Sequence, residues 1–119
     1  MSLRSEQGRL AEDQALGFLQ QAGLKLIARN FHSRYGEIDL IMEDGRTLVF
    51  VEVRYRSSDR YGSAEESVNH RKQARLVLTA ASFLKEKRLN RPTRFDVAAL
   101  SPGPEGLSVA WIKGAFQSE

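Results

Sequence analysis

Cysteine is absent from this chain of 119 residues, which excludes disulfide bonds and thiolate metal sites. Long hydrophobic runs are absent as well, because no apolar stretch approaches the roughly 20 residues that cross a bilayer. The first six residues contain no apolar region of the kind found in a signal peptide. These absences predict a cytoplasmic protein that has no membrane partner.

The residues for several common catalytic chemistries are missing too. The two histidines, His32 and His70, show no metal-ligand spacing and are expected on the surface or in loops. The sequence contains no glycine-rich phosphate-binding loop and no serine in a nucleophile elbow. These chemistries are therefore poor candidates, and the acidic residues become the main candidates for a functional site.

Composition is that of an ordinary soluble globular protein, and the length predicts a single domain over residues 1–119. Apolar residues make up 41% of the chain and charged residues 28%. The net charge is +3, which is a mild sign of a nucleic-acid partner, and arginine far outnumbers lysine. Arginine suits bidentate recognition of phosphate, although a GC-rich genome would produce the same excess.

The hydrophobic pattern predicts helices and strands in the order αβββαββ. Alanines and Phe18 recur at three- and four-residue steps up to Gly23, as in an amphipathic helix with a glycine C-cap. Ser63 and Glu66 match a capping box, so we expect the second helix to begin there. The expected helices span residues 5–22 and 63–88, and the expected strands span residues 24–31, 37–42, 47–56, 94–100 and 107–112.

Two acidic residues lie in or beside hydrophobic, strand-like runs. Asp39 lies within residues 37–41, and Glu52 directly follows the most hydrophobic run of the chain, residues 48–51. Burying a carboxylate costs free energy unless a partner compensates for it. A metal ion, with a phosphate behind it, is the obvious partner.

The turn between these two strands determines which side chains share a face. A two-residue Asp-Gly loop at 44–45 would place Glu37 opposite Glu52 and Asp39 opposite Phe50. Because side chains alternate along a strand, one face of the sheet then collects Glu37, Asp39, Glu52 and Arg54. Like charges across a strand pair are destabilising, so this face requires a compensating cation.

Mg²⁺ or Mn²⁺ fits such a face, because Mg²⁺ takes one or two carboxylates and completes its shell with waters and substrate phosphates. A bound ion of this kind can activate water and stabilise a phosphodiester in transit. Arg54 can donate hydrogen bonds and offset negative charge, but it does not deprotonate and so cannot serve as a general base. The alternative stays open that these acids and arginines form only an ion-pair network.

Basic residues flank the acidic ones along the chain, where they suit contacts with a nucleic-acid backbone, and tyrosines among them are available for stacking. The groups are Arg54, Arg56 and Arg60; Arg71, Lys72 and Arg75; and Arg88, Arg91 and Arg94. Taken singly, each group also fits a solvated helix face or loop. Asp96, in a later strand, is expected to be a structural ion-pair partner.

In combination these segments resemble the YraN family, small bacterial proteins of the restriction-endonuclease-like, PD-(D/E)xK superfamily that are related to Holliday-junction resolvases. The resemblance extends over nearly the whole chain. The matching segments are Gly36-Glu37-Ile38-Asp39-Leu40-Ile41, residues 48–56, Lys72, residues 80–81, residues 94–97 and residues 115–116.

The resemblance implies an α/β fold with a restriction-endonuclease-like αβββαββ core, in which helices flank a central mixed β-sheet. It implies that Asp39 and Glu52 are metal ligands. Glu12 matches the first-helix acid that resolvase-like members add to the site, as an auxiliary metal ligand or a water-positioning acid. Arg54 stands at the position of the superfamily lysine, and Lys72 is the residue that can reach in from the second helix to replace that lysine. Glu37 belongs to the family's Gly-Glu-Ile-Asp run without a clear role.

The leading hypothesis is a Mg²⁺-dependent, nuclease-like protein that binds and cleaves DNA, in branched or single-stranded form. Its phosphate contacts would come from Arg54, Arg56, Arg60, Arg71, Lys72 and Arg75. The alternative is a catalytically inactive nucleic-acid-binding module of the same fold, which Arg54 at the lysine position favours. A third hypothesis is an assembly protein whose acids only form ion pairs. A homodimer is expected by analogy with resolvases.

Overall fold

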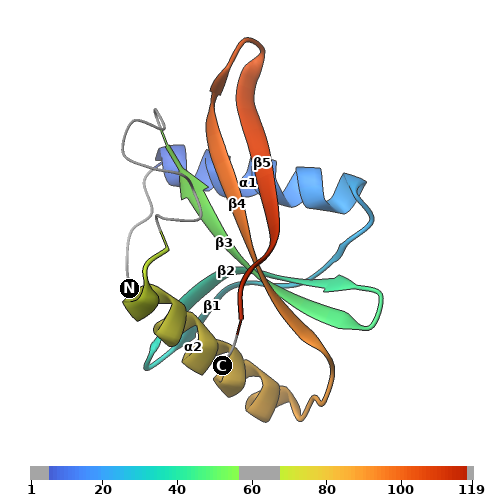
Figure 1. Ribbon diagram of the computed structural model, residues 1–119. Helices are drawn as coiled ribbons and strands as arrows, with labels where there is room; N and C mark the ends of the chain where they lie inside the picture. The colour runs from blue at the N-terminus through green and yellow to red at the C-terminus, as the bar shows by residue number, and fades with distance from the viewer. Residues whose placement is uncertain (1–5, 57–67, 118–119) are drawn as a thin grey trace.

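The computed structural model describes residues 6–56 and 68–117, which form two helices and one five-stranded sheet (Figure 1). The elements are α1 (Glu6–Gln21), β1 (Lys25–Ser33), β2 (Gly36–Asp44), β3 (Thr47–Tyr55), α2 (His70–Lys87), β4 (Thr93–Gly103) and β5 (Gly106–Phe116). Neighbouring strands of the sheet, whose order is β1-β2-β3-β4-β5, are antiparallel except for the parallel pair β3 and β4. This arrangement confirms the predicted α/β fold with a mixed sheet and is consistent with a restriction-endonuclease-like core.

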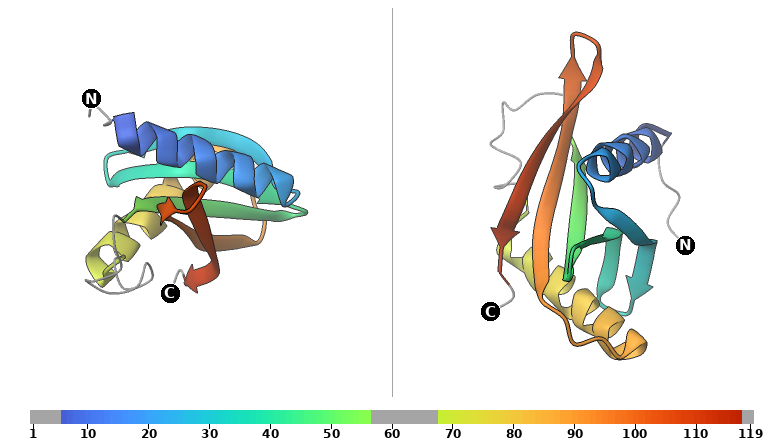
Figure 2. Two further views of the ribbon diagram at one scale, coloured as in Figure 1. Left: turned by 90° about the horizontal axis from the view of Figure 1, so that it is seen from above. Right: turned by 90° about the vertical axis from the view of Figure 1, so that its right-hand side faces the viewer.

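The two helices cover opposite faces of the sheet (Figure 2). On one face, α1 packs Ala15 and Leu19 into a buried cluster with strand side chains. On the other face, α2 packs Leu76 and Phe83 into a second buried cluster. The helix α2 also makes the crossover that the parallel strands β3 and β4 require. None of the helices in the described ranges is long and apolar enough to cross a membrane.

The strand β3 divides its side chains between these two clusters. Phe50 packs on the α2 side of the sheet, whereas Val49 and Val51 pack on the α1 side. The same alternation brings Glu52 and Arg54 out on the α2 side, beyond the end of the apolar run. The acidic end of β3 therefore faces α2.

The hairpin of β2 and β3 has a different register from the one predicted. Ile41 lies opposite Phe50, where the sequence predicted Asp39, and Leu40 with Val51 is the last pair before the strands part. The prediction was wrong by two residues. An even shift leaves the alternation of β3 unchanged. Glu37, Asp39, Glu52 and Arg54 still line one common pocket, so the predicted grouping of acidic side chains survives the error.

The turn itself explains the shift. Gly45 takes a left-handed φ of 61°, which glycine adopts without steric cost, and it forms the two-residue turn with Arg46. Asp44 remains in β2, where it pairs with Thr47 and its carboxylate accepts a hydrogen bond from Arg94 Nη1 at 3.1 Å. Asp44 is therefore part of the strand, although the Asp-Gly pattern had assigned it to the loop.

The helix α2 begins at His70 and not at Ser63. Asn69 precedes it in an extended conformation and caps it, because the Asn69 side chain accepts a hydrogen bond from the Lys72 N–H at 2.9 Å. The residues of the predicted capping box, 63–66, lie outside the described ranges. The position of the asparagine cap places Lys72 in the first turn of the helix.

The hairpin of β4 and β5 is longer than predicted. The strand β4 continues to Gly103 and β5 begins at Gly106, so most of the predicted turn at 101–106 belongs to the two strands. The pair of Gly103 with Gly106 closes the hairpin, and its tip extends beyond both helices (Figure 1).

Candidate metal and phosphate site

A pocket of about 330 Å³ opens on the α2 side of the sheet, between β2, β3 and α2. Gly36, Val53 and Leu76 form part of its lining. The rest of the lining consists of residues that the sequence had singled out: Glu37, Asp39, Glu52, Arg54, Lys72 and Arg75. The fold thus brings these candidate residues to one place from two strands and a helix.

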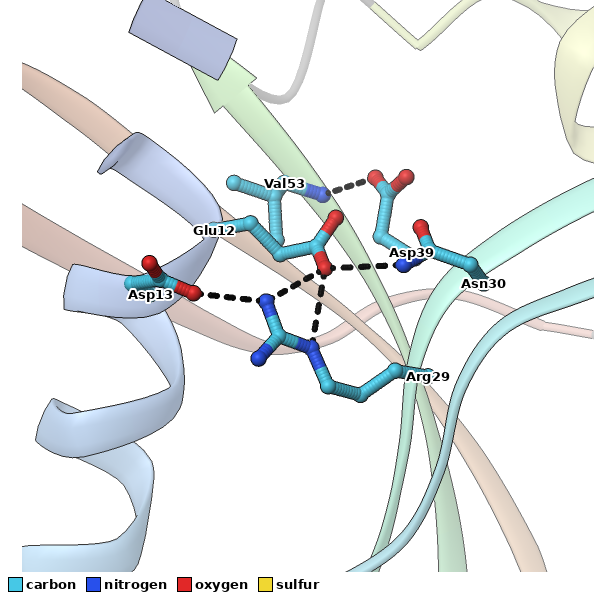
Figure 3. A network of polar contacts seen from close by, with 6 residues as sticks. All are labelled: Glu12, Asp13, Arg29, Asn30, Asp39 and Val53. Atoms are coloured by element: carbon cyan, nitrogen blue, oxygen red, sulfur yellow. Dashed lines mark hydrogen bonds and ion pairs between the residues drawn. The ribbon is translucent and has the colours of Figure 1, made fainter. Parts of the chain in front are cut away.

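The strands β2 and β3 part beside this pocket, and Asp39 lies where they part. Beyond the last backbone pair, the Val53 N–H donates a hydrogen bond to Asp39 Oδ2 at 2.8 Å (Figure 3). The carboxylate oxygen thus accepts a hydrogen bond from an N–H group of β3 that has no backbone partner in β2. Asp39 is only 9% exposed, and this hydrogen bond holds its carboxylate at the edge of β3.

Glu52 supplies the second carboxylate of the pocket. It is 5% exposed, its Oε2 forms an ion pair with Lys72 Nζ, and the same oxygen lies 3.5 Å from Arg54 Nη1. Burial and the negative charge of Asp39 raise the pKa of Glu52 to about 7, and Lys72 opposes this rise. Two like charges in a poorly solvated place are the electrostatic setting that favours a bound cation.

The oxygen donors fit a hard divalent cation. Asp39 and Glu52 offer the carboxylate oxygens that Mg²⁺ and Mn²⁺ prefer. Within residues 6–56 and 68–117, no three His, Cys, Asp or Glu side chains are assembled as a metal site. A bound ion would therefore rely on two carboxylates plus waters or phosphate oxygens, which is the usual arrangement for Mg²⁺.

Glu12 lies on α1, on the other side of the sheet, and is 1% exposed. Its Oε1 accepts hydrogen bonds from Arg29 Nε at 3.0 Å, from Arg29 Nη2 at 2.7 Å and from Asn30 Nδ2 at 3.2 Å (Figure 3). Asp13 binds the same guanidinium at 2.7 Å. Glu12 is not part of the pocket lining. Its described contacts tie α1 to β1, and its role as an additional acid of the site stays a prediction.

Asn30 belongs to this region as well, although its residue type and position did not mark it as a candidate. It takes a left-handed φ of 53° in β1 and lies between two regular pairs of the β1–β2 ladder, opposite Asp39. The alternation of β2 breaks at the same point, because Ile38 packs on the α2 side and Leu40 on the α1 side. The available signal was an asparagine within a strand pattern, since asparagine tolerates this conformation better than most residues.

The predicted basic residues differ in their position relative to the pocket. Arg54, Lys72 and Arg75 line the pocket. Arg56 directly follows β3 and Arg71 lies exposed in the first turn of α2, so both are close in sequence to the pocket lining. The predicted contact residue Arg60 lies outside the described residues.

Two of the remaining arginines, Arg91 and Arg94, have structural partners. Arg94 binds both carboxylate oxygens of Asp96, at 2.9 and 3.0 Å, and Asp96 also accepts hydrogen bonds from Trp111 Nε1 and the Gly114 N–H, both at 2.9 Å. Asp96 is 1% exposed, so the prediction that it is a structural ion-pair partner is confirmed. Arg91 donates to a backbone carbonyl of the β2–β3 turn at 2.9 Å.

Comparison with known proteins gives one consistent result. Residues 11–100 match the model of the uncharacterised protein family UPF0102. A UPF0102 protein of Methylococcus capsulatus is 47% identical over 112 residues, which cover 94% of this chain and 91% of the relative. A UPF0102 protein of Pseudomonas syringae pv. tomato is 51% identical, with 98% and 97% covered, and one of Nitrosococcus oceani is 44% identical, with 96% and 94% covered.

Proposed function

The chain belongs to the uncharacterised protein family UPF0102, which is the YraN family. From the geometry of the site, we propose that it is a Mg²⁺-dependent, nuclease-like protein that binds and cleaves DNA. One observation carries this proposal: two buried carboxylates, Asp39 and Glu52, share a pocket with Lys72 and two arginines. Acidic groups for a metal and basic groups for a phosphate are the two requirements of metal-assisted phosphodiester hydrolysis.

The roles of the side chains follow from their positions. Asp39 and Glu52 would hold Mg²⁺ or Mn²⁺, which when bound activates water and offsets charge on the phosphodiester. Lys72 already lies against Glu52, so its ammonium group is near any phosphate that reaches the ion. Arg54 and Arg75 would bind phosphate oxygens, because a guanidinium stays protonated and presents several N–H donors.

A catalytically inactive nucleic-acid-binding module is the second candidate function. The ion pair of Lys72 with Glu52 favours this alternative, because it compensates the Glu52 charge without any metal. Arg54 at the lysine position of the superfamily motif points the same way. In this case the pocket would bind phosphate through its basic residues alone.

The deciding experiment is cleavage of a labelled panel of duplex, single strand, flap and four-way junction in Mg²⁺, Mn²⁺ or EDTA. The test variant is Glu52→Ala, and the matched control is Glu86→Gln, since Glu86 is an exposed acid of α2 outside the pocket. Metal-dependent cutting that is lost in Glu52→Ala and kept in Glu86→Gln supports the nuclease. Binding without cutting under every metal supports the inactive module.

Two further expectations accompany the proposal. We expect a homodimer, because two equal sites would treat two strands alike, and light scattering during gel filtration measures this directly. We also expect the protein to act in the cytoplasm, because a chain without cysteine fits a reducing compartment in which disulfide bonds rarely form. If binding to DNA does not weaken as salt rises, both nucleic-acid functions fail, because phosphate contacts release counterions.

A further inference from the structure

The turn between β1 and β2 presents a stacked pair of side chains beside the pocket. The Cζ of Arg34 lies 4.9 Å from the centre of the Tyr35 ring, and Arg34 Nη2 donates a hydrogen bond to Tyr35 Oη at 2.7 Å. Arg34 is exposed and Tyr35 is half-buried. A guanidinium held over an aromatic ring is a flat, positively charged surface that solvent can reach.

This turn is anchored to α2 by hydrogen bonds. The Tyr35 N–H donates to Ser33 Oγ at 3.0 Å, and Ser33 Oγ donates to Thr79 Oγ1 at 3.2 Å. Thr79 is fully buried in α2 and donates in turn to the Arg75 carbonyl at 2.8 Å. The backbone that carries Arg34 and Tyr35 is therefore tied, through Ser33, to the same helix that supplies basic residues to the pocket.

The next residue along the chain connects the turn to the pocket. Gly36 lines the pocket, and a side chain added there would lie 3.8 Å from Thr79 Oγ1 and 3.9 Å from Arg75 Cβ. Its φ of +147° also suits glycine. Tyr35 directly precedes Gly36, and consecutive Cα atoms are about 3.8 Å apart, so the turn lies beside the pocket lining.

We infer that Arg34 and Tyr35 form a stacking platform for an unpaired nucleobase next to the phosphate held in the pocket. This inference rests on the proposed function and specifies its substrate class: a strand with at least one unstacked base at the site. Proteins read unpaired bases by stacking them on aromatic rings or guanidinium planes, whereas bases within a duplex have both faces covered. A fixed platform loses little conformational entropy when a base binds to it.

The test compares the affinity of the full chain for a labelled oligo-dT strand and for a blunt duplex of the same length. The binding buffer contains Ca²⁺ in place of Mg²⁺, because Ca²⁺ also takes oxygen ligands. The variants are Tyr35→Leu, which removes the ring, and Tyr35→Phe, which keeps the ring and removes only the hydroxyl. We expect Tyr35→Leu to weaken single-strand binding about tenfold, the order of one stacked base, and to leave duplex binding within about twofold. Tyr35→Phe keeps the ring but loses the hydrogen bond from Arg34, so it should weaken single-strand binding less than Tyr35→Leu does.

Each other outcome contradicts the inference in a distinguishable way. If Tyr35→Leu weakens binding to strand and duplex equally, or weakens neither, the platform is overturned while metal-dependent cleavage by the wild type still supports the proposed function. If the wild type binds neither nucleic acid, both are overturned. Thermal unfolding of Tyr35→Leu within a few degrees of the wild type shows that a loss of binding does not come from loss of the fold.

Discussion

Lys72 of α2 forms an ion pair with Glu52 of β3, across the pocket in which Asp39 also lies. The sequence left two candidates for the cation of this site, Arg54 on the strand and Lys72 on the helix. Both contact Glu52, but the Arg54 guanidinium is the more distant, at 3.5 Å. The first turn of α2, capped by Asn69, therefore supplies a lysine where the strand motif has an arginine.

Replacing Lys72 should lower cleavage more than replacing Arg54 does. We expect Lys72→Met to reduce the cleavage rate on the order of 100-fold, as loss of one positioned donor to a developing charge typically does. Arg54→Met should cost less, because Lys72 remains in place. Single-turnover cleavage in Mn²⁺ measures both, and a larger loss in Arg54→Met would assign the role to the strand arginine.

Glu52 should make the metal-free protein less stable as the pH rises. Its pKa is raised from 4.5 to about 7, so between these values the folded state keeps a proton that the unfolded state has lost. Raising the pH through this window therefore lowers the free energy of unfolding, on the order of 2 kcal/mol. Urea unfolding in EDTA at about pH 5 and about pH 8 should show Glu52→Gln gaining on the wild type at the higher pH. An equal difference at both values would contradict this assignment.

Asp39→Asn and Glu12→Gln should separate a metal ligand from a structural acid. We expect Asp39→Asn to abolish Mn²⁺ binding measured by calorimetry, because it removes one of two carboxylates in the pocket. Glu12→Gln should chiefly lower stability, by about 2–3 kcal/mol, since it weakens buried hydrogen bonds from Arg29 and Asn30. If Glu12→Gln loses Mn²⁺ binding as completely as Asp39→Asn, Glu12 is a ligand after all.

Asn30 should be sensitive to substitution through its backbone. Asn30→Gly keeps access to the left-handed φ of 53° and loses the bond to Glu12, whereas Asn30→Ala loses both. We expect the alanine variant to be less stable than the glycine variant by about 1 kcal/mol in urea unfolding. If the irregular strand also positions Asp39, the alanine variant binds Mn²⁺ more weakly than the glycine variant. Equal Mn²⁺ affinities would confine Asn30 to stability.

Asp96 should contribute to stability but not to metal binding. Asp96→Ala removes the acceptor for Arg94, Trp111 and the Gly114 N–H, and we expect a loss of about 3 kcal/mol in the free energy of unfolding. Asp44→Ala, a half-exposed acid bound to the same arginine, should cost about 1 kcal/mol or less. Mn²⁺ affinity of the folded Asp96 variant should match the wild type, and a selective loss would place Asp96 in the site.

The sequence was sufficient for the layers of the fold and for the acidic face. Local periodicity specifies helices and strands, and a carboxylate such as Asp39 or Glu52 in or beside an apolar run is visible without any structure. The hairpin shows that the face of a side chain is easier to predict than its opposite partner, because the two-residue slip left Glu52 and Arg54 on the predicted face of β3.

What the sequence could not provide comes from contacts between distant segments. Arg94 contacts Asp44 from 50 residues away along the chain, and no local rule contains that contact. The left-handed conformation of Asn30 also depends on its neighbours in space. The start of α2 at His70 depends on the Asn69 cap, which competed with the capping box predicted at Ser63. The point at which β2 and β3 part, beside Asp39, could not be predicted either. A strand pattern in the sequence does not show where the backbone hydrogen bonds between two strands end.

The hydrogen bond from the Val53 N–H to Asp39 gives the site a spectroscopic reporter of its own. A backbone amide whose acceptor is a carboxylate changes its chemical shift when that carboxylate gains a proton, a metal ion or another partner. Its hydrogen exchange rate likewise follows any local opening between the two strands. A single resonance in a ¹⁵N-labelled sample can therefore follow the occupancy of the pocket without any substrate.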